Sequence, residues 1–172
     1  MASSTPAEAD TSPQPRETRL DTVAAQTAAI DELIGMARHK LQVFDVDLSQ
    51  TGWETAARAA HLAALLRRAP AVRIDIILHD TRWLQGSCPR LTNLLRQYSY
   101  AITVYQTGQE AKVAMDPLLI VDGRHYLHRF HIDQPRAVLV IENPQQTSPL
   151  ATRFEEIWAT GEPGMAGTVL GL

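Results

Sequence analysis

The sequence predicts one α/β domain with a mixed, mostly parallel central sheet flanked by helices. Two observations carry this prediction. In the first two thirds of the chain, apolar runs of strand length alternate with longer runs of helical period, a pattern typical of parallel β-α-β units. Further along, strand-like runs follow one another around short turns, and such neighbours pair antiparallel, which makes the sheet mixed.

The first half of the domain is expected to alternate helices with strands. Thr51 and Glu54 have the spacing of a capping box, Asp80 can cap the helix that follows it, and Pro70 and Pro89 interrupt helices. The expected elements are a helix over 18–40, a strand over 41–47, a helix over 51–69, a strand over 71–80 and a split helix over 81–98.

The second half of the domain is expected to contain consecutive strands and a closing helix. Asp122 and Gly123 form a strong hairpin-turn signal. The final helix is predicted because apolar side chains recur at i, i+4, i+7 and i+8; they are Leu150, Phe154, Ile157 and Trp158. The expected strands are 101–107, 117–123, 124–132 and 137–144.

Length and composition bound the organisation and the setting of the chain. The 172 residues suit one domain over 18–163 with its core in 41–160, a disordered tail over 1–17 and a loose tail over 164–172. The net charge of −3 predicts no overall attraction to nucleic acid, so we expect no nucleic-acid partner. No apolar run approaches the roughly 18 residues that span a bilayer, so we expect no membrane contact. The single cysteine, Cys88, excludes a cysteine-based zinc site and favours a cytoplasmic setting.

Five segments, in this order, resemble one repeat of the phospholipase D superfamily. They are LLRRAP, VRIDIILHD, LLRQYSYAITVYQ, LLIVDGRHYL and AVLVIENPQQTSPLATRFEEIWA. The resemblance covers residues 41–160 and implies the fold of one phospholipase D-like half. The chain is also similar to short bacterial domains of unknown function that share a degenerate form of this repeat, some of them joined to an acyltransferase-like domain.

The resemblance implies that the catalytic residues of the superfamily are missing. Its chemistry needs H-x-K-x4-D followed by G-S/T-x-N. In the frame anchored by 121–123, Met115 takes the place of the His and Pro117 that of the Lys, and only Asp122 matches. The second motif falls on 129–132, which also departs from the pattern. Methionine is no nucleophile for phosphoryl transfer and proline carries no charge, so we expect no catalytic residue here.

One dense cluster of candidate phosphate ligands remains in the hairpin. Within a strand, Arg129 and His131 share one face and His128 the other. The alternative is a solvated or dimer-facing hairpin, with Asp122 a turn residue. The histidine spacing of three does not suit a joint metal site on a strand, so we expect no metal. The candidate anion-binding residues are Arg124, Arg129, His128, His131 and Asp122.

Carboxylates form a second group of candidates. Asp45, Asp47 and Asp80 lie at the ends of the first two strands, where ligand sites of open α/β sheets occur. Two such carboxylates suit a divalent cation, but helix capping explains each of them more simply.

Three functions stay open. The favoured one is a non-catalytic phospholipase D-like domain with a binding, regulatory or scaffold role. The second is a divergent phosphodiesterase or nuclease that uses a relocated histidine within 124–131, and the third is an accessory partner of an acyltransferase-like enzyme. We expect no cofactor and, for the hairpin cluster, a phosphate-containing ligand; the sequence does not identify a protein partner. The resemblance implies a homodimer with residues 118–130 near its interface.

Overall fold

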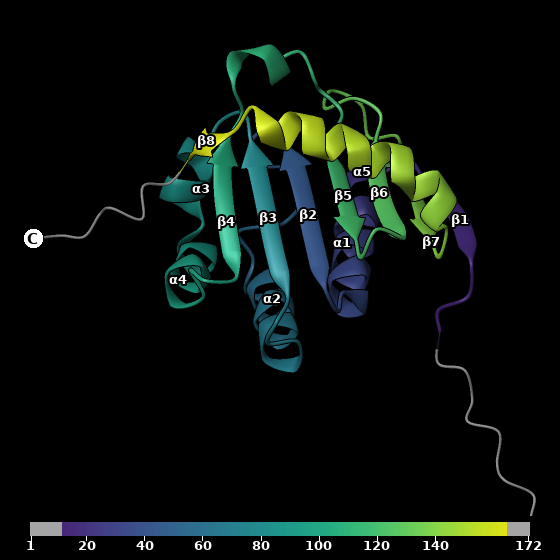
Figure 1. The fold of residues 1–172 in the computed structure, drawn as a ribbon, viewed down its shortest axis with the longest axis horizontal. Coiled ribbons are helices and arrows are strands. Elements are labelled where there is room, and N and C mark those ends of the chain that lie inside the picture. The colour runs from purple at the N-terminus through teal and green to yellow at the C-terminus, as the bar shows by residue number, and fades with distance from the viewer. Residues whose placement is uncertain (1–11, 165–172) are drawn as a thin grey trace, which may run out of the picture.

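An open eight-stranded sheet lies between two layers of helices in the computed structural model, which describes residues 12–164 (Figure 1). The strands are β1 (Arg16–Leu20), β2 (Lys40–Asp45), β3 (Arg73–Leu78), β4 (Ile102–Gln106), β5 (Leu118–Val121), β6 (His125–Arg129), β7 (Ala137–Ile141) and β8 (Glu162–Pro163). The helices are α1 (Val23–Met36), α2 (Ala56–Arg68), α3 (Arg82–Ser87), α4 (Pro89–Gln97), α5 (Pro144–Ala159) and the 3₁₀ turn η1 (Gln109–Ala111).

The strands are ordered β1-β7-β6-β5-β2-β3-β4-β8. The α/β class and the mixed sheet are therefore confirmed. The parallel part is smaller than expected, because only the β2–β3 and β3–β4 pairs are parallel and every other neighbouring pair is antiparallel. The reason is that a parallel pair needs a crossover of about a dozen residues or more, whereas short loops join β5, β6 and β7.

Most of the expected elements occur near their expected bounds, and the expected split of the helix over 81–98 falls at Cys88, between α3 and α4. The helix expected over 18–40 is shorter, because a strand, β1, precedes it. β1 begins at Arg16, inside the segment 1–17, while residues 1–11 of that segment and 165–172 of the other expected tail lie outside the described residues.

The expected capping box at Thr51 is wrong, because α2 begins later. The cap is Thr55, whose hydroxyl accepts the backbone N–H of Arg58 at 3.1 Å. Leu48 and Gly52 adopt positive φ angles of 71° and 80°, which turn the chain between β2 and α2 and exclude a helix there. The loop 46–55 that results forms one wall of the site described below.

Two apolar layers hold the sheet. On one face, α1, α2 and α4 pack against alternate residues of the strands, such as Leu41 and Val43. On the other face, α5 packs through Phe154 and Ile157 against the remaining strand residues, such as Phe44. Figure 1 shows α5 lying across one face and the other helices behind the sheet. Because β5, β6 and β7 are covered on both faces, a polar side chain there needs a partner inside the protein.

Candidate functional site

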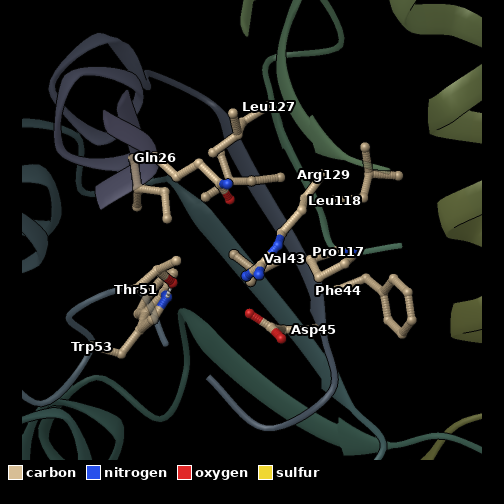
Figure 2. A pocket seen from close by; sticks show the side chains of 12 residues that line it. Gln26, Val43, Phe44, Asp45, Thr51, Trp53, Pro117, Leu118, Leu127 and Arg129 are labelled. Atoms are coloured by element: carbon tan, nitrogen blue, oxygen red, sulfur yellow. Dashed lines mark hydrogen bonds between the residues drawn. The ribbon is translucent and has the colours of Figure 1, made fainter. Parts of the chain in front are cut away.

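A small pocket lies where β2 and β6 end and β5 begins, on the sheet face that α1 covers (Figure 2). Its volume of about 30 Å³ admits only groups the size of a few water molecules. Pro117 and Arg129, which occupy positions of the two superfamily motifs, both line it. The pocket is lined by Gln26, Ile30, Val43, Phe44, Asp45, Thr51, Trp53, Pro117, Leu118, Leu119, Leu127 and Arg129.

The guanidinium of Arg129 fills one side of the pocket and is bound by the protein itself. Its Nε donates to the carbonyl oxygen of Gln134 at 2.6 Å, and its Nη2 donates to that of Ile132 at 2.7 Å. Its Nη1 donates to the side-chain oxygen of Gln50 at 2.7 Å. Burial lowers the pKa of Arg129, and attraction to Asp45 opposes that effect. Arg129 thus ties β6 to two loops.

Asp45 forms the opposite side of the pocket, and Figure 2 shows its carboxylate facing Arg129. The side chain is buried, and its Oδ1 accepts the backbone N–H of Val46 at 2.6 Å. Burial raises the pKa of Asp45 to about 6; the N–H of Val46 and the charge of Arg129 oppose this rise, and the charge of Asp47 adds to it. A carboxylate at this place repels a phosphate group.

Arg58 fixes the loop that closes the pocket. This buried side chain extends from α2 and donates from Nε to the carboxylate of Asp31 at 2.6 Å. Its Nη2 donates to the carbonyl oxygens of Thr27 and Thr51 at 3.2 and 2.9 Å, and its guanidinium lies over the ring of Trp53. Since Thr51 and Trp53 line the pocket, this one arginine joins α1, α2 and the pocket wall.

Asp122 lies at the far end of β5 from the pocket. Its Oδ1 accepts the backbone N–H groups of His39 and Lys40 at 2.8 Å each, and its Oδ2 accepts that of Arg38 at 3.0 Å. With Gly123 it makes the hairpin turn at positive φ angles of 54° and 67°. The residue that matches the superfamily motif therefore connects the hairpin to the start of β2.

His128 faces the opposite side of the sheet from Arg129, toward α5. Its Nε2 lies 2.8 Å from Oδ2 of Asp116, whose Oδ1 accepts Nη2 of Arg153 at 2.5 Å. Burial raises the pKa of Asp116, but the hydrogen bonds of His128 and Arg153 outweigh it, so the pKa is lowered. The ring of Phe130 packs edge-on against His128.

The other two candidates lie apart from both places. Arg124, at the hairpin turn, pairs with Glu142 at 3.3 Å. His131 lies beyond the end of β6, and its Nδ1 accepts the backbone N–H of Asp133 at 3.1 Å. The five candidate anion ligands are thus distributed over the pocket, the α5 face, the hairpin turn and an exposed loop, and the structure does not bring them together.

Sequence reasoning missed the partners of these residues. Gln50 and Arg153 carried no signal, because each meets its partner only through the fold. Asp116 was detectable in principle, because it lies between the two motif positions Met115 and Pro117.

Among residues 12–164 there is no cluster of His, Cys, Asp or Glu that could hold a metal ion. No helix in that same part of the chain has the length and apolar character to cross a membrane.

Comparison with solved structures identifies the fold. An archaeal chromatin protein, TrmBL2, whose structure shows a novel mode of DNA binding, matches 86% of this chain at a TM-score of 0.64 and 12% identity; the match covers 55% of TrmBL2, so this chain spans about half of it. Nuc from Salmonella typhimurium, a phospholipase D family member, matches 87% of this chain and 97% of its own at a TM-score of 0.61 and 14% identity. NucT from Helicobacter pylori matches 87% of this chain and 99% of its own at a TM-score of 0.60 and 10% identity.

These matches show a phospholipase D-like fold, and the identities are too low to show more. None of the curated proteins matches the sequence. A family model does match it, over residues 22–166, and its description is "Domain of unknown function (DUF7931)". Because this match covers most of the chain, the protein belongs to the DUF7931 family, with a phospholipase D-like fold.

Proposed function

We propose that this protein is a non-catalytic phospholipase D-like domain that acts by binding. One observation carries the proposal: the groups at the two motif positions in the pocket serve the fold. Pro117 offers neither charge nor backbone donor, and Arg129 is hydrogen-bonded to Gln50, Ile132 and Gln134. A phosphodiester would have to displace these bonds to reach the guanidinium.

The charge around the pocket supports the same conclusion. Asp45, Asp47 and Asp80 lie at or just beyond the ends of β2 and β3. Arg82 bonds the carboxylate of Asp80 and lowers its pKa to about 2, so Asp80 is ionised at neutral pH. Phosphodiesters are anions, and Asp45 and Asp47, which form no ion pair among the described residues, repel them, while Arg82 offsets the charge of Asp80.

The alternative of a relocated histidine nucleophile needs a histidine beside Arg129 in one groove. His128 and Arg129 lie on opposite faces of β6. Nε2 of His128 is hydrogen-bonded to the carboxylate of Asp116. No observation favours an accessory role beside an acyltransferase-like enzyme. A DNA-binding chromatin protein contains the same fold, which supports a binding role for this one.

A phosphodiesterase assay tests the proposal. We expect the full chain to hydrolyse neither bis(4-nitrophenyl) phosphate nor linear DNA above a buffer blank, with a phospholipase D-type enzyme as the active control. Turnover that disappears in His128→Ala or His131→Ala would contradict the proposal and support the relocated histidine.

A restoration experiment sharpens this test. In Met115→His/Pro117→Lys the two motif side chains return, but Arg129 and Asp45 still occupy the pocket. We therefore expect this double variant to remain inactive. Activity in it would show that the two lost side chains alone separate this domain from an enzyme.

A further inference from the structure

Basic side chains gather at the end of the sheet opposite the pocket. Four of the seven arginines between residues 55 and 101 lie at this end, and two more cations, Arg38 and Lys40, come from the loop after α1 and the first residue of β2. Figure 1 shows that β2, β3 and β4 begin at this end, beside α2 and α4. We call this surface the basic edge; its cationic residues are Arg38, Lys40, Arg67, Arg68, Arg73 and Arg96.

Hydrogen bonds place the loops of the basic edge side by side. The backbone N–H of Arg73 donates to the carbonyl oxygen of His39 at 3.0 Å, next to the Lys40–Arg73 pair of the β2–β3 ladder. Nη1 of Arg73 donates to the carbonyl oxygen of Tyr100 at 2.8 Å, just before β4. Arg68 reaches from α2 to the carbonyl oxygens of Ile34 and Ala37 at the end of α1.

The positive charge of the basic edge is only partly neutralised. Glu155 pairs with Lys40, Asp75 of β3 interacts with the charges of Lys40 and Arg73, and the carboxylate of Asp122 accepts backbone N–H groups. Arg38, Arg67 and Arg96 are exposed and form no ion pair among the described residues. The ends of α1, α2 and α4 each contribute roughly −0.5 of an elementary charge, less than one arginine. Burial, together with the charge of Arg38, lowers the pKa of Arg68, as expected in a positive field.

Two tyrosines lie within this cationic surface. Tyr100 is 63% exposed, the highest exposed fraction of any aromatic side chain among the described residues. The ring of Tyr98 lies 6.1 Å from it at an angle of 55°. An exposed ring beside arginines is typical of surfaces on which an unpaired base stacks while the backbone phosphates meet cations.

We infer that the basic edge binds single-stranded nucleic acid, with Arg38, Arg67 and Arg96 on phosphates and Tyr100 stacked on a base. The cations at issue are arginines, whose planar fork matches two phosphate oxygens at once. No other large hydrophobic side chain is exposed at this edge in the described structure, which argues against insertion into a membrane. The inference names the partner for the proposed binding role, but it uses the opposite end of the sheet from the pocket.

Binding of the full chain to a fluorescein-labelled 20-nucleotide oligo-dT, followed by anisotropy, tests the inference. Three phosphate contacts predict a slope of log affinity against log salt of about −2, hence a loss of about 20-fold between 50 and 200 mM salt. The Arg67→Glu/Arg96→Glu variant is expected to weaken binding by more than about tenfold and to flatten the slope.

A matched control separates the site from the overall charge. Arg19→Glu/Arg136→Glu makes the same charge change at two exposed arginines near β1 and β7, so we expect less than about a twofold effect. The side chains of Arg67 and Arg96 form no hydrogen bond among the described residues, but both lie in the last turn of a helix, so the Arg67→Glu/Arg96→Glu variant should unfold slightly below the parent chain and still be folded at the temperature of the binding assay. The Arg67→Gln/Arg96→Gln pair removes the two positive charges without adding negative ones, and its affinity for oligo-dT provides a second measurement.

The tyrosine gives a second, independent readout. Tyr100→Ala should lower affinity for oligo-dT by about fivefold or more without changing the salt slope, and it should leave binding to a 20-base-pair duplex unchanged. The inference is overturned by absence of oligo-dT binding at 50 mM salt, by equal losses in the two glutamate variants, or by binding only to vesicles that contain phosphatidylglycerol. A positive phosphodiesterase assay with intact edge binding would overturn the non-catalytic proposal alone.

Discussion

Asp45 and Arg129 define the pocket at the scale of single residues. Each is buried, and they face one another without an ion pair among the described residues (Figure 2). The arginine is satisfied by Gln50, Ile132 and Gln134, whereas the carboxylate has the backbone N–H groups of Val46 and Asp47 as donors. Of the two buried groups, Asp45 is therefore the one whose protonation changes near neutral pH.

The raised pKa of Asp45 predicts that this side chain destabilises the protein at neutral pH. The folded form holds a proton up to about pH 6, while the unfolded chain releases it near 3.8, so stability falls as pH rises through this window. A shift of this size corresponds to roughly 3 kcal/mol. We expect Asp45→Asn to raise the urea-unfolding free energy by about 1–3 kcal/mol at pH 7.5 and hardly at all at pH 4.

Asp133→Asn is the matched control for this measurement, because the side chain of Asp133 is 83% exposed. It should change stability by less than about 0.5 kcal/mol at both pH values. A gain from Asp45→Asn that is the same at pH 4 and pH 7.5 would show that protonation of Asp45 is not the cause.

Part of the site was predictable at this scale. The alternation of a strand already indicated that His128 and Arg129 face opposite sides, and the structure confirms this. What each side chain meets was not predictable, because the contacts come from distant segments. Arg129 bonds Gln50, 79 residues away, and that contact exists only after β2 and β6 have been brought together by the sheet.

At the scale of elements, the apolar period is a local signal, so it predicted β2 to β7 and all five α-helices. β1 and β8 gave no such signal. β1 exposes four of its five residues, and β8 has only two residues, both exposed. Each is a strand only because it pairs with β7 or β4, far away in the chain. Pairing of this kind depends on tertiary structure and leaves no local pattern.

The β5–β6 hairpin depends on Asp122, which accepts three backbone N–H groups at the start of β2. Asp122→Ala leaves these donors without their charged acceptor, so we expect a loss of about 1.5–3 kcal/mol in the free energy of urea unfolding. Asp122→Asn keeps one oxygen and the left-handed turn preference, and it should lose less. Equal, small effects of both variants would mean that water replaces the carboxylate and that the hairpin is held otherwise.

At the scale of the whole molecule, the two ends of the sheet differ in charge. Asp45, Asp47 and Asp80 lie at the pocket end, where Arg58, Arg82 and Arg129 are bonded to carboxylate or carbonyl oxygens or to Gln50. The exposed Arg38, Arg67 and Arg96 of the basic edge, by contrast, form no ion pair among the described residues. The net charge of −3 hides this separation, because composition sums over both ends. The expectation that nucleic acid is not a partner rested on that sum, and the fold provides the reason to test it.

Pairing of two chains is the remaining prediction at this scale, and it rests on the resemblance to single-repeat members of the superfamily. Val113 and Phe130, 87% and 53% exposed, are large apolar side chains that extend into solvent. They belong to two neighbouring segments, which are joined where the backbone N–H of Ile132 donates to the carbonyl oxygen of Met115. We expect light scattering to give twice the 19.0 kDa of one chain, and Val113→Asp/Phe130→Asp to give one chain.

Tyr100→Asp is the control for this experiment, since it replaces an exposed large side chain by aspartate, with one negative charge in place of two, at the opposite end of the sheet. It should leave the dimer intact, because the interface implied by the resemblance lies near residues 118–130. Even weak specific dimers form at about 100 μM. If the unchanged protein has the mass of one chain at this concentration, the prediction of a homodimer is wrong. Loss of the dimer in Tyr100→Asp alone would instead place the interface at the basic edge, where it would compete with nucleic acid.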